Sequence, residues 1–398
     1  MNGQQETLPF IPLCAPILLG LALLLISVPA CAAGSFAAVS AAMQECIAKQ
    51  EVPGVVTLVA TRDQVLHVEA AGLADIAAKT PMRTNSICWI ASMTKPITAT
   101  AVLMLQDEGK LSVDDPVARY LPELGDLKAP GGKPAKLTLR HLLTHTSGMP
   151  EAAVEQYRTA HSLADLIPFY AGKPLKFEPG SKWQYCQSGI NSLGRIVEVV
   201  SGQSFPDFLQ KRLFDSLGMK DTTFYLSSKQ LPRLAKSYRR TEAALQEEPI
   251  GFLAGHPPTD RHRYPAPNGG LFSTAPDYAK FCQMILNQGT LDGKRYLKPE
   301  SVRLMTSIQT GDLKTGFTDG NGWGLGWCVV RQPQGVTAML SAGTCGHGGA
   351  YGTQAWIDPV KQVIYILMVQ RSNFPNADAS EVRRAFQSAA AGALGPGH

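Results

Sequence analysis

The pair Ser92 and Lys95 combines a hydroxyl that could act as a nucleophile with an amine that could activate it. Both lie in the run Ser92-Met93-Thr94-Lys95, where a spacing of three residues would place the two side chains on one helix face. A serine hydroxyl is a weak nucleophile until a base takes its proton, and burial can lower the pKa of a lysine enough for that task. At a helix N-terminus, Ser92 would also lie among free N–H groups that favour developing negative charge. On this motif alone we favour the simpler interpretation, a helix cap and a solvated lysine, because about one such pair occurs by chance in a chain of this length.

Two later segments supply further candidate groups. Tyr185 lies in the run Trp183-Gln184-Tyr185-Cys186-Gln187, just before a helix with an apolar stripe. Residues 346–352 are rich in glycine, contain His347 and precede an apolar run. Glycines beside a strand let a substrate approach its edge closely and leave an N–H available to bind an oxyanion. These segments make a catalytic role for Ser92 more plausible than the motif alone does.

The elements that must position these residues indicate one sheet assembled from both ends of the chain. Apolar runs bounded by turn residues predict strands at residues 55–61, 65–71, 324–331, 354–357 and 363–370. Apolar residues at helical spacing predict helices at residues 36–50, 92–108, 276–287 and 377–391, and a helix around Leu193, Ile196, Val197 and Val200 that ends at Gly202. Residues 110–265 are mainly helical segments and Pro-rich loops. We therefore expect an α/β (α+β) fold with a mainly antiparallel sheet flanked by helices and a mostly helical insertion at roughly 110–265.

In chain order, these segments resemble the motifs of the serine β-lactamase-like superfamily, which comprises class C β-lactamases, low-molecular-weight penicillin-binding proteins and related esterases. The run from Ser92 to Lys95 matches its S-x-x-K motif. The family's L-L-x-H-T-S-G-x-P segment is similar to residues 142–150, and its P-G…Y-x-N…L-G-M-x-D-T run to residues 179–222. Residues 269–277 resemble G-G-L-x-S-T-A-x-D, and His347-Gly348-Gly349 stands where the family has K-T-G. The resemblance covers nearly the whole chain after residue 33.

The resemblance implies a β-lactamase/transpeptidase-like fold and acyl transfer through a covalent ester. Ser92 would be the nucleophile, with Lys95 and Tyr185 as proton carriers, and which of the two is the base during acylation stays open. The N–H groups of Ser92 and Ala350 would form the oxyanion hole. No metal or organic cofactor is implied, and the substrate would be a small-molecule ester, amide or peptide. The alternative from another class is a catalytically silent scaffold of the same fold, against which the complete set of three residues argues.

Two departures from the family pattern bear on the substrate. The second motif ends in Gln187 where many relatives have Asn, which changes the amide that meets a substrate carbonyl. The third motif begins with His347, followed by Gly348 and Gly349, and histidine is mostly neutral at pH 7 where a lysine offers a fixed charge to a substrate carboxylate. Both changes favour esters or related acyl compounds. A D,D-peptidase, penicillin-binding or β-lactam-hydrolysing enzyme remains the alternative among enzymes.

The first 32 residues differ from the rest and predict export. The length of the apolar core at residues 17–26 suits a signal-peptide hydrophobic region better than a spanning helix, and Ala30-Cys31-Ala32 resembles a signal-peptidase site. Lipidation of Cys31 and an uncleaved N-terminal anchor are the alternatives, and no basic residue precedes Lys49. We expect a signal peptide or anchor at residues 1–32, a hydrolase domain at residues 33–398, and a periplasmic or secreted protein with membrane attachment through the N-terminal segment as an option.

The composition excludes several classes of protein. With 44% apolar and 17% charged residues among 398, the chain is globular. Its net charge of +5 is spread evenly, so nucleic-acid binding has no support. The scattered cysteines show no metal-type spacing and suit buried single thiols. The sequence contains no G-x-S-x-G elbow, which excludes an α/β-hydrolase site.

Two other segments have weaker functional interpretations. His141 and His145 have the spacing of a zinc-binding pair, but no HExxH glutamate accompanies them, so we expect no metal. The loop at residues 255–265, rich in proline and charge, either flanks the pocket as a specificity loop or is a solvated surface loop.

Overall fold

The computed structural model describes residues 1–10 and 36–395. The chain divides into two units, Met1–Ala33 and Gly34–His398, and residues 1–10 of the first form no helix or strand. The apolar core at 17–26, the expected cleavage site and Cys31 lie outside the described residues. Among the described residues, none of the helices has the length and apolar character needed to cross a membrane.

An eight-stranded antiparallel sheet joins the two ends of the chain, as the sequence predicts. Its strand order is β10-β11-β12-β13-β14-β1-β2-β3. In its middle, β1 (Gly54–Ala60) pairs with β14 (Val363–Met368), with Leu58 opposite Ile366. The other strands of this sheet are β2 (Val65–Asp75), β3 (Thr80–Pro81), β10 (Asn321–Trp323), β11 (Cys328–Val330), β12 (Cys345–Gly348) and β13 (Gln354–Asp358). Every residue of β1 and β14 is buried, which explains why both sequences are apolar apart from Thr57 in β1.

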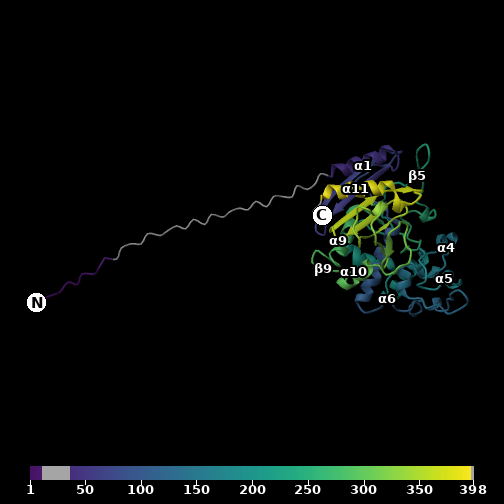
Figure 1. Ribbon diagram of the computed structural model, residues 1–398, viewed down its shortest axis with the longest axis horizontal. Coiled ribbons are helices and arrows are strands. Elements are labelled where there is room, and N and C mark those ends of the chain that lie inside the picture. The colour runs from purple at the N-terminus through teal and green to yellow at the C-terminus, as the bar shows by residue number, and fades with distance from the viewer. Residues whose placement is uncertain (11–35, 396–398) are drawn as a thin grey trace. The chain divides into compact units, whose positions relative to one another are not determined.

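Alternate residues of the central strands face two different cores, as the period of a strand requires. Val55 and Val59 of β1 pack with the helices α1 (Ala37–Ala48) and α11 (Glu381–Leu394). Val56 and Leu58 belong to the larger core on the other face. Figure 1 shows α1 and α11, the first and last helices of the chain, side by side over one face of the sheet.

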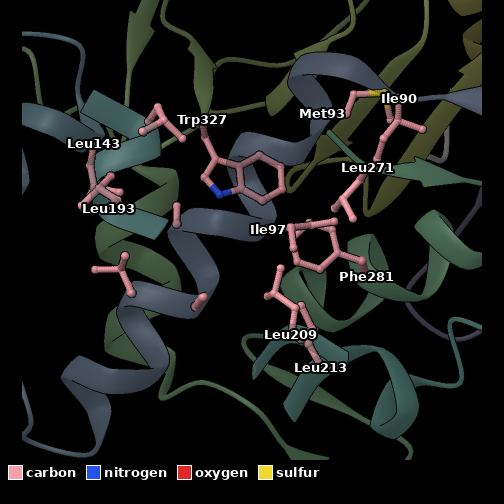
Figure 2. Close-up of a cluster of buried hydrophobic side chains, with 14 of the residues drawn as sticks. Ile90, Met93, Ile97, Leu143, Leu193, Leu209, Leu213, Leu271, Phe281 and Trp327 are labelled. Atoms are coloured by element: carbon pink, nitrogen blue, oxygen red, sulfur yellow. The ribbon is translucent and has the colours of Figure 1, made fainter. Parts of the chain in front are cut away.

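Helix α2 (Thr94–Asp107) runs through the larger core. Its residues from Thr94 to Leu105 are all buried, and it packs against α6 (Gln187–Ser201). Figure 2 shows Ile97 among the side chains of this core, with Met93 just before it in the chain. This packing fixes the position of the helix that begins just after Ser92.

The remaining elements surround this core. Apart from the helices named above, the longest helix of the described residues is α9 (Ala275–Leu286), which packs on β1 and β14. The shorter helices are α3 (Leu139–Leu143), α4 (Val154–Thr159), α5 (Leu163–Ala171), α7 (Phe205–Leu209), α8 (Asp215–Leu217), α10 (Pro299–Thr306) and the π-helical turn Gln210–Phe214. The minor strands are β4 (Cys88–Trp89) with β7 (Phe272–Ser273), β8 (Thr290–Leu291) with β9 (Lys294–Arg295), and β5 (Tyr238–Arg240) between β6 (Leu245–Glu247) and β15 (Arg371–Ser372). The stretch 110–265 therefore contains the strands β5 and β6 beside its helices.

One predicted strand is wrong over more than half of its length. Of residues 324–331, only Cys328–Val330 form a strand, β11. The preceding residues make a turn, in which the N–H of Gly324 donates to the carbonyl of Trp327 and Gly326 has a φ of 77°. A Cβ at Gly326 would lie 2.6 Å from that of Ala99 on α2, so the turn exists to let the chain pass close to this helix.

The last predicted helix starts later than expected. Residues Ala377–Ala379 form a 3-10 turn, and α11 begins at Glu381, where the side chain of Ser380 accepts a hydrogen bond from the N–H of Arg383. A serine cap of this kind sets a helix start. The six cysteines of the described residues are buried free thiols, which confirms that prediction.

Candidate active site

Ser92 lies in a strained turn at the start of α2. It is the middle residue of the 3-10 turn Ala91–Met93, which leads into α2. Ala91 has a φ of 47°, a left-handed conformation that costs a non-glycine residue about 1 kcal/mol or more and concentrates at functional sites. Thr94 holds the turn, because its Oγ1 donates to the carbonyl of Ala91 at 2.7 Å and accepts from the N–H of Leu271. The N–H of Ser92 donates to no acceptor among the described residues, so it is available to an anion, as first-turn N–H groups are.

Lys95 is fully buried next to Ser92. Its Nζ lies 3.0 Å from the Oγ of Ser92 and donates to the backbone carbonyl of Asn268 at 2.6 Å. Burial lowers the pKa of Lys95 to about 7, against a weaker opposing effect of the Glu151 carboxylate. The amine is therefore a base at neutral pH, within hydrogen-bond reach of the hydroxyl that it would activate.

Tyr185 lies over the same amine. The Nζ of Lys95 is 4.5 Å from the centre of the Tyr185 ring, and the phenol oxygen is 3.3 Å from Nε2 of His347. Burial raises the pKa of Tyr185 well above 10, although a hydrogen bond with Ser92 opposes the shift. Phe317 and Trp323 pack edge-on against its ring. Tyr185 is thus held as a neutral phenol that can donate or relay a proton.

Two residues that the sequence analysis did not single out as catalytic hold the segment around Tyr185. Nδ1 of His145 accepts from the N–H of Cys186 at 3.1 Å, while its carbonyl accepts from the N–H of Gln184. The Glu151 carboxylate accepts from the N–H of Gln187 at 2.6 Å and from the N–H of Ser188 at 3.0 Å, so it caps the N-terminus of α6. An acidic residue at a helix N-terminus is stabilising, but its distance of 36 residues from that helix gave no sequence signal.

Gln187 and Asn268 form a second polar wall of the site. The side-chain amide of Asn268 donates to Oε1 of Gln187 at 2.9 Å, and the Asn268 carbonyl binds Lys95. Asn268 was not predicted, although it directly precedes the Gly269-Gly270 pair of the family motif. The Oδ1 of Asn268 is buried and has no hydrogen-bond partner within the described chain.

His347 is buried and neutral on β12. Burial and, more weakly, the nearby Lys95 lower its pKa to about 3, and its Nδ1 lies 2.7 Å from the carbonyl of Gly348. The ladder between β11 and β12 ends at Gly346, which leaves the following residues with an open edge. The site therefore presents an imidazole without charge where the family motif has a lysine.

The glycines after His347 are required by packing. A Cβ at Gly348 would lie 1.8 Å from Oδ1 of Asp378, and one at Gly349 would lie 2.0 Å from Oγ1 of Thr353. The N–H of Gly349 donates to the carbonyl of Thr353. The N–H of Ala350 bonds to no acceptor among the described residues, and Ala350 is exposed. Of the two N–H groups, that of Ala350 is the one available to an oxyanion.

The two histidines at zinc-like spacing, His141 and His145, form hydrogen bonds with nearby groups of the chain. Nδ1 of His141 pairs with Thr138 in the cap of α3, and His145 binds the backbone as described above. No cluster of three or more potential metal ligands occurs in the part of the chain that the structure describes. The loop at 255–265 does flank the site: His256, Arg263 and Tyr264 line a cavity of about 320 Å³ beside Gln187.

The chain is similar to a family of known proteins and to solved structures. The family model described as Beta-lactamase matches residues 39–390. Esterase EstB of Burkholderia gladioli is 32% identical over 362 residues, which cover 82% of this chain and 88% of that protein. Penicillin-binding protein 4 of Amycolatopsis lactamdurans is 33% identical over 313 residues, 77% of each chain. Among solved structures, EstCE1, titled a hydrolase with promiscuous acyltransferase activity, is 25% identical with a TM-score of 0.79 and covers 90% of this chain and 98% of that one.

Proposed function

This chain belongs to the beta-lactamase family and is a serine hydrolase, and we propose that it cleaves esters or related acyl compounds through an acyl-enzyme on Ser92. The observation that carries the proposal is the 3.0 Å contact between Oγ of Ser92 and a buried Lys95 amine whose pKa is about 7. A base with a pKa near the working pH is the most effective proton acceptor for this step.

The mechanism follows from the positions of these groups. Lys95 takes the proton of Ser92 as Oγ attacks the substrate carbonyl, and the N–H groups of Ser92 and Ala350 stabilise the oxyanion by about 3 kcal/mol per donor. The Lys95 ammonium then returns its proton to the leaving alkoxide, with Tyr185 as a relay. Water then attacks the acyl-enzyme and gives a proton to Lys95, which passes it to the leaving Oγ of Ser92 as the carboxylic acid is released. We assign Lys95 as the acylation base because the raised pKa of Tyr185 keeps its phenol protonated.

The neutral state of His347 supports an ester preference. Its pKa of about 3 leaves the imidazole uncharged throughout the pH range in which Lys95 can act. A substrate carboxylate next to the scissile bond, as in penicillins or peptides with a free C-terminus, therefore meets no fixed positive charge from this residue. Esters that have no carboxylate next to the scissile bond do not need a positive charge at the position of His347.

We also propose that residues 1–32 direct export. The support is the apolar core at 17–26 followed by Ala30-Cys31-Ala32. Expression of the full chain followed by cell fractionation and intact-mass analysis would test this. A mature mass starting at residue 33 in the exported fraction is the expected result, and an unprocessed chain confined to the cytoplasm would overturn it.

Intact-mass analysis with three reagents tests the reaction itself. The protein is incubated with a fluorophosphonate, a penicillin or 4-nitrophenyl butyrate, with Ser92→Ala as the control and release of nitrophenolate recorded. We expect a Ser92-dependent fluorophosphonate adduct and ester turnover without a stable penicilloyl adduct or loss of β-lactam. A persistent penicilloyl adduct would instead indicate a penicillin-binding peptidase. No Ser92-dependent adduct and no turnover would leave a silent scaffold.

A further inference from the structure

An apolar cavity opens next to the candidate active site. It has a volume of about 320 Å³ and reaches Gln187 and Asn268, whose side-chain amides bond to each other, and the backbone carbonyl of Asn268 accepts from Lys95. Its walls are largely apolar, with Phe252 and Leu253 among them. A cavity of this size holds a small ligand or part of one, so a substituent of the substrate fits here.

Arg263 brings a buried positive charge to the wall of this cavity. Its exposed fraction is 6%, and its guanidinium stacks 4.8 Å from the centre of the Tyr225 ring. The side chain donates one hydrogen bond, to the carbonyl of Phe224, and its Nε has no partner in the described chain. The Arg263 guanidinium forms no ion pair with an Asp or Glu of the described residues, and Asp260 on the same loop is bound to His256 at 2.7 Å.

The other two buried arginines of the described residues make more hydrogen bonds, although each also has one buried nitrogen without a partner, Nε of Arg371 and Nη2 of Arg383. Arg371 donates to the carboxylate and the carbonyl of Glu51, and Arg383 donates to Gln387 and to the carbonyl of Asp378. Burying a charge without a partner is expensive, whereas a guanidinium binds a carboxylate through two parallel hydrogen bonds. Arg263 differs from both because its side chain makes a single hydrogen bond and lines a cavity, which indicates that a ligand in the cavity supplies the missing acceptor.

We propose that Arg263 binds a carboxylate of the substrate, so that the preferred substrates are short esters with an acid group a few carbons from the ester carbonyl. The inference rests on the proposed function of Ser92. In this proposal the positive charge that binds the substrate carboxylate is Arg263 in the cavity, and not the residue at the position of His347, which is neutral. The apolar wall accommodates the carbon chain that separates the two ends of such a substrate.

The test compares substrates that differ only in this charge. One pair is mono(4-nitrophenyl) glutarate and its methyl ester, which carry the acid group, free or masked, on the acyl side. The other is 4-carboxyphenyl butyrate and its methyl ester, which carry it on the alcohol side. The measured quantity is the ratio of kcat/KM for free acid to methyl ester. In one of the two pairs we expect a ratio of about 10 to 100, the size of a charge-assisted hydrogen bond, and the pair that shows it identifies the side.

Variants of the loop connect this ratio to one side chain. Arg263→Met should bring the ratio to about 1, and Arg263→Lys should keep part of it because the charge remains. The matched control is Arg261→Met, which removes an exposed arginine from the same loop, 5.7 Å from the same Tyr225 ring, and should leave the ratio as in the wild type. Thermal unfolding of each variant reports its fold. If Arg263→Met fails to fold, the Arg263→Lys variant tests the role, because a full wild-type ratio there would count against the guanidinium.

The outcomes separate this inference from the proposed function. Turnover of the methyl esters with no preference for either free acid, or a preference that survives in a folded Arg263→Met, overturns the role of Arg263 and leaves the esterase intact. Absence of any Ser92-dependent turnover or fluorophosphonate adduct overturns both.

Discussion

Acidification from pH 7 to pH 6 should slow acylation of Ser92 about fivefold, and each further pH unit about tenfold, because the reaction needs the neutral amine of Lys95. With a pKa of about 7, about half of the amine is neutral at pH 7 and about a tenth at pH 6. At the ordinary lysine value of 10.5, only about one molecule in three thousand would be neutral at pH 7. Full burial of the side chain thus raises the population of active enzyme by about a thousandfold.

The rate of fluorophosphonate labelling, followed by intact mass between pH 5 and 9, measures this population without the later hydrolysis step. We expect a single rising limb with its midpoint near pH 7 and a plateau above pH 8. The other two groups should add no limb, since His347 stays neutral above its pKa of about 3 and Tyr185 stays protonated. A midpoint above pH 9, or labelling that persists in Lys95→Ala, would refute the assignment of this lysine as the base.

The Glu151→Gln variant independently checks the direction in which a nearby carboxylate shifts the pKa of Lys95. The Glu151 carboxylate stabilises the Lys95 ammonium, so its removal should lower the pKa further and move the limb to lower pH. The glutamine retains an oxygen that can accept from the N–H of Gln187, which preserves much of the cap on α6. A shift of the limb to higher pH would contradict the electrostatic argument.

Three further predictions concern packing and charge at His347 and Gly348 of the candidate site and at Glu51 outside it. Gly348→Ala should lower the free energy of unfolding by about 2 kcal/mol and reduce labelling of Ser92, because its Cβ would overlap a carboxylate oxygen at 1.8 Å. The control is Gly392→Ala on the exposed face of α11, where a Cβ meets nothing within 4 Å, and it should raise the free energy of unfolding by up to about 1 kcal/mol. Equal effects of the two variants in urea denaturation would contradict the steric argument. Glu51→Ala removes the carboxylate that Arg371 binds at 2.7 Å and should cost about 2 kcal/mol in the same assay, where an unchanged midpoint would count against it. His347→Lys should raise kcat/KM about tenfold for esters with a carboxylate next to the scissile bond, relative to neutral esters, and an unchanged ratio would remove the charge argument.

The sheet could be predicted from the sequence because burial leaves a local mark. Both β1 and β14 are buried on both faces, and their sequences, at opposite ends of the chain, are apolar apart from Thr57. The helix that carries Lys95 likewise shows its apolar stripe in consecutive turns. Most of the strand expected at 324–331 is wrong, because the chain turns at Gly326, where it passes close to α2. The residues near Gly326 in the sequence give no signal of this contact.

The sequence by itself determined which residue types stand at the site and in what order: Ser92 three residues before Lys95, a tyrosine in the next segment, and a histidine in place of the third-motif lysine. Only the tertiary structure decided what those residues can do. The pKa of Lys95 depends on complete burial and on a carboxylate 56 positions later, and the neutrality of His347 depends on what encloses it. Asn268 and Arg263 enter the site from loops far along the chain, so their roles arise from contacts that folding creates. The physical reason is that chemical type is a property of each residue, whereas desolvation and electrostatic fields belong to the assembled surroundings.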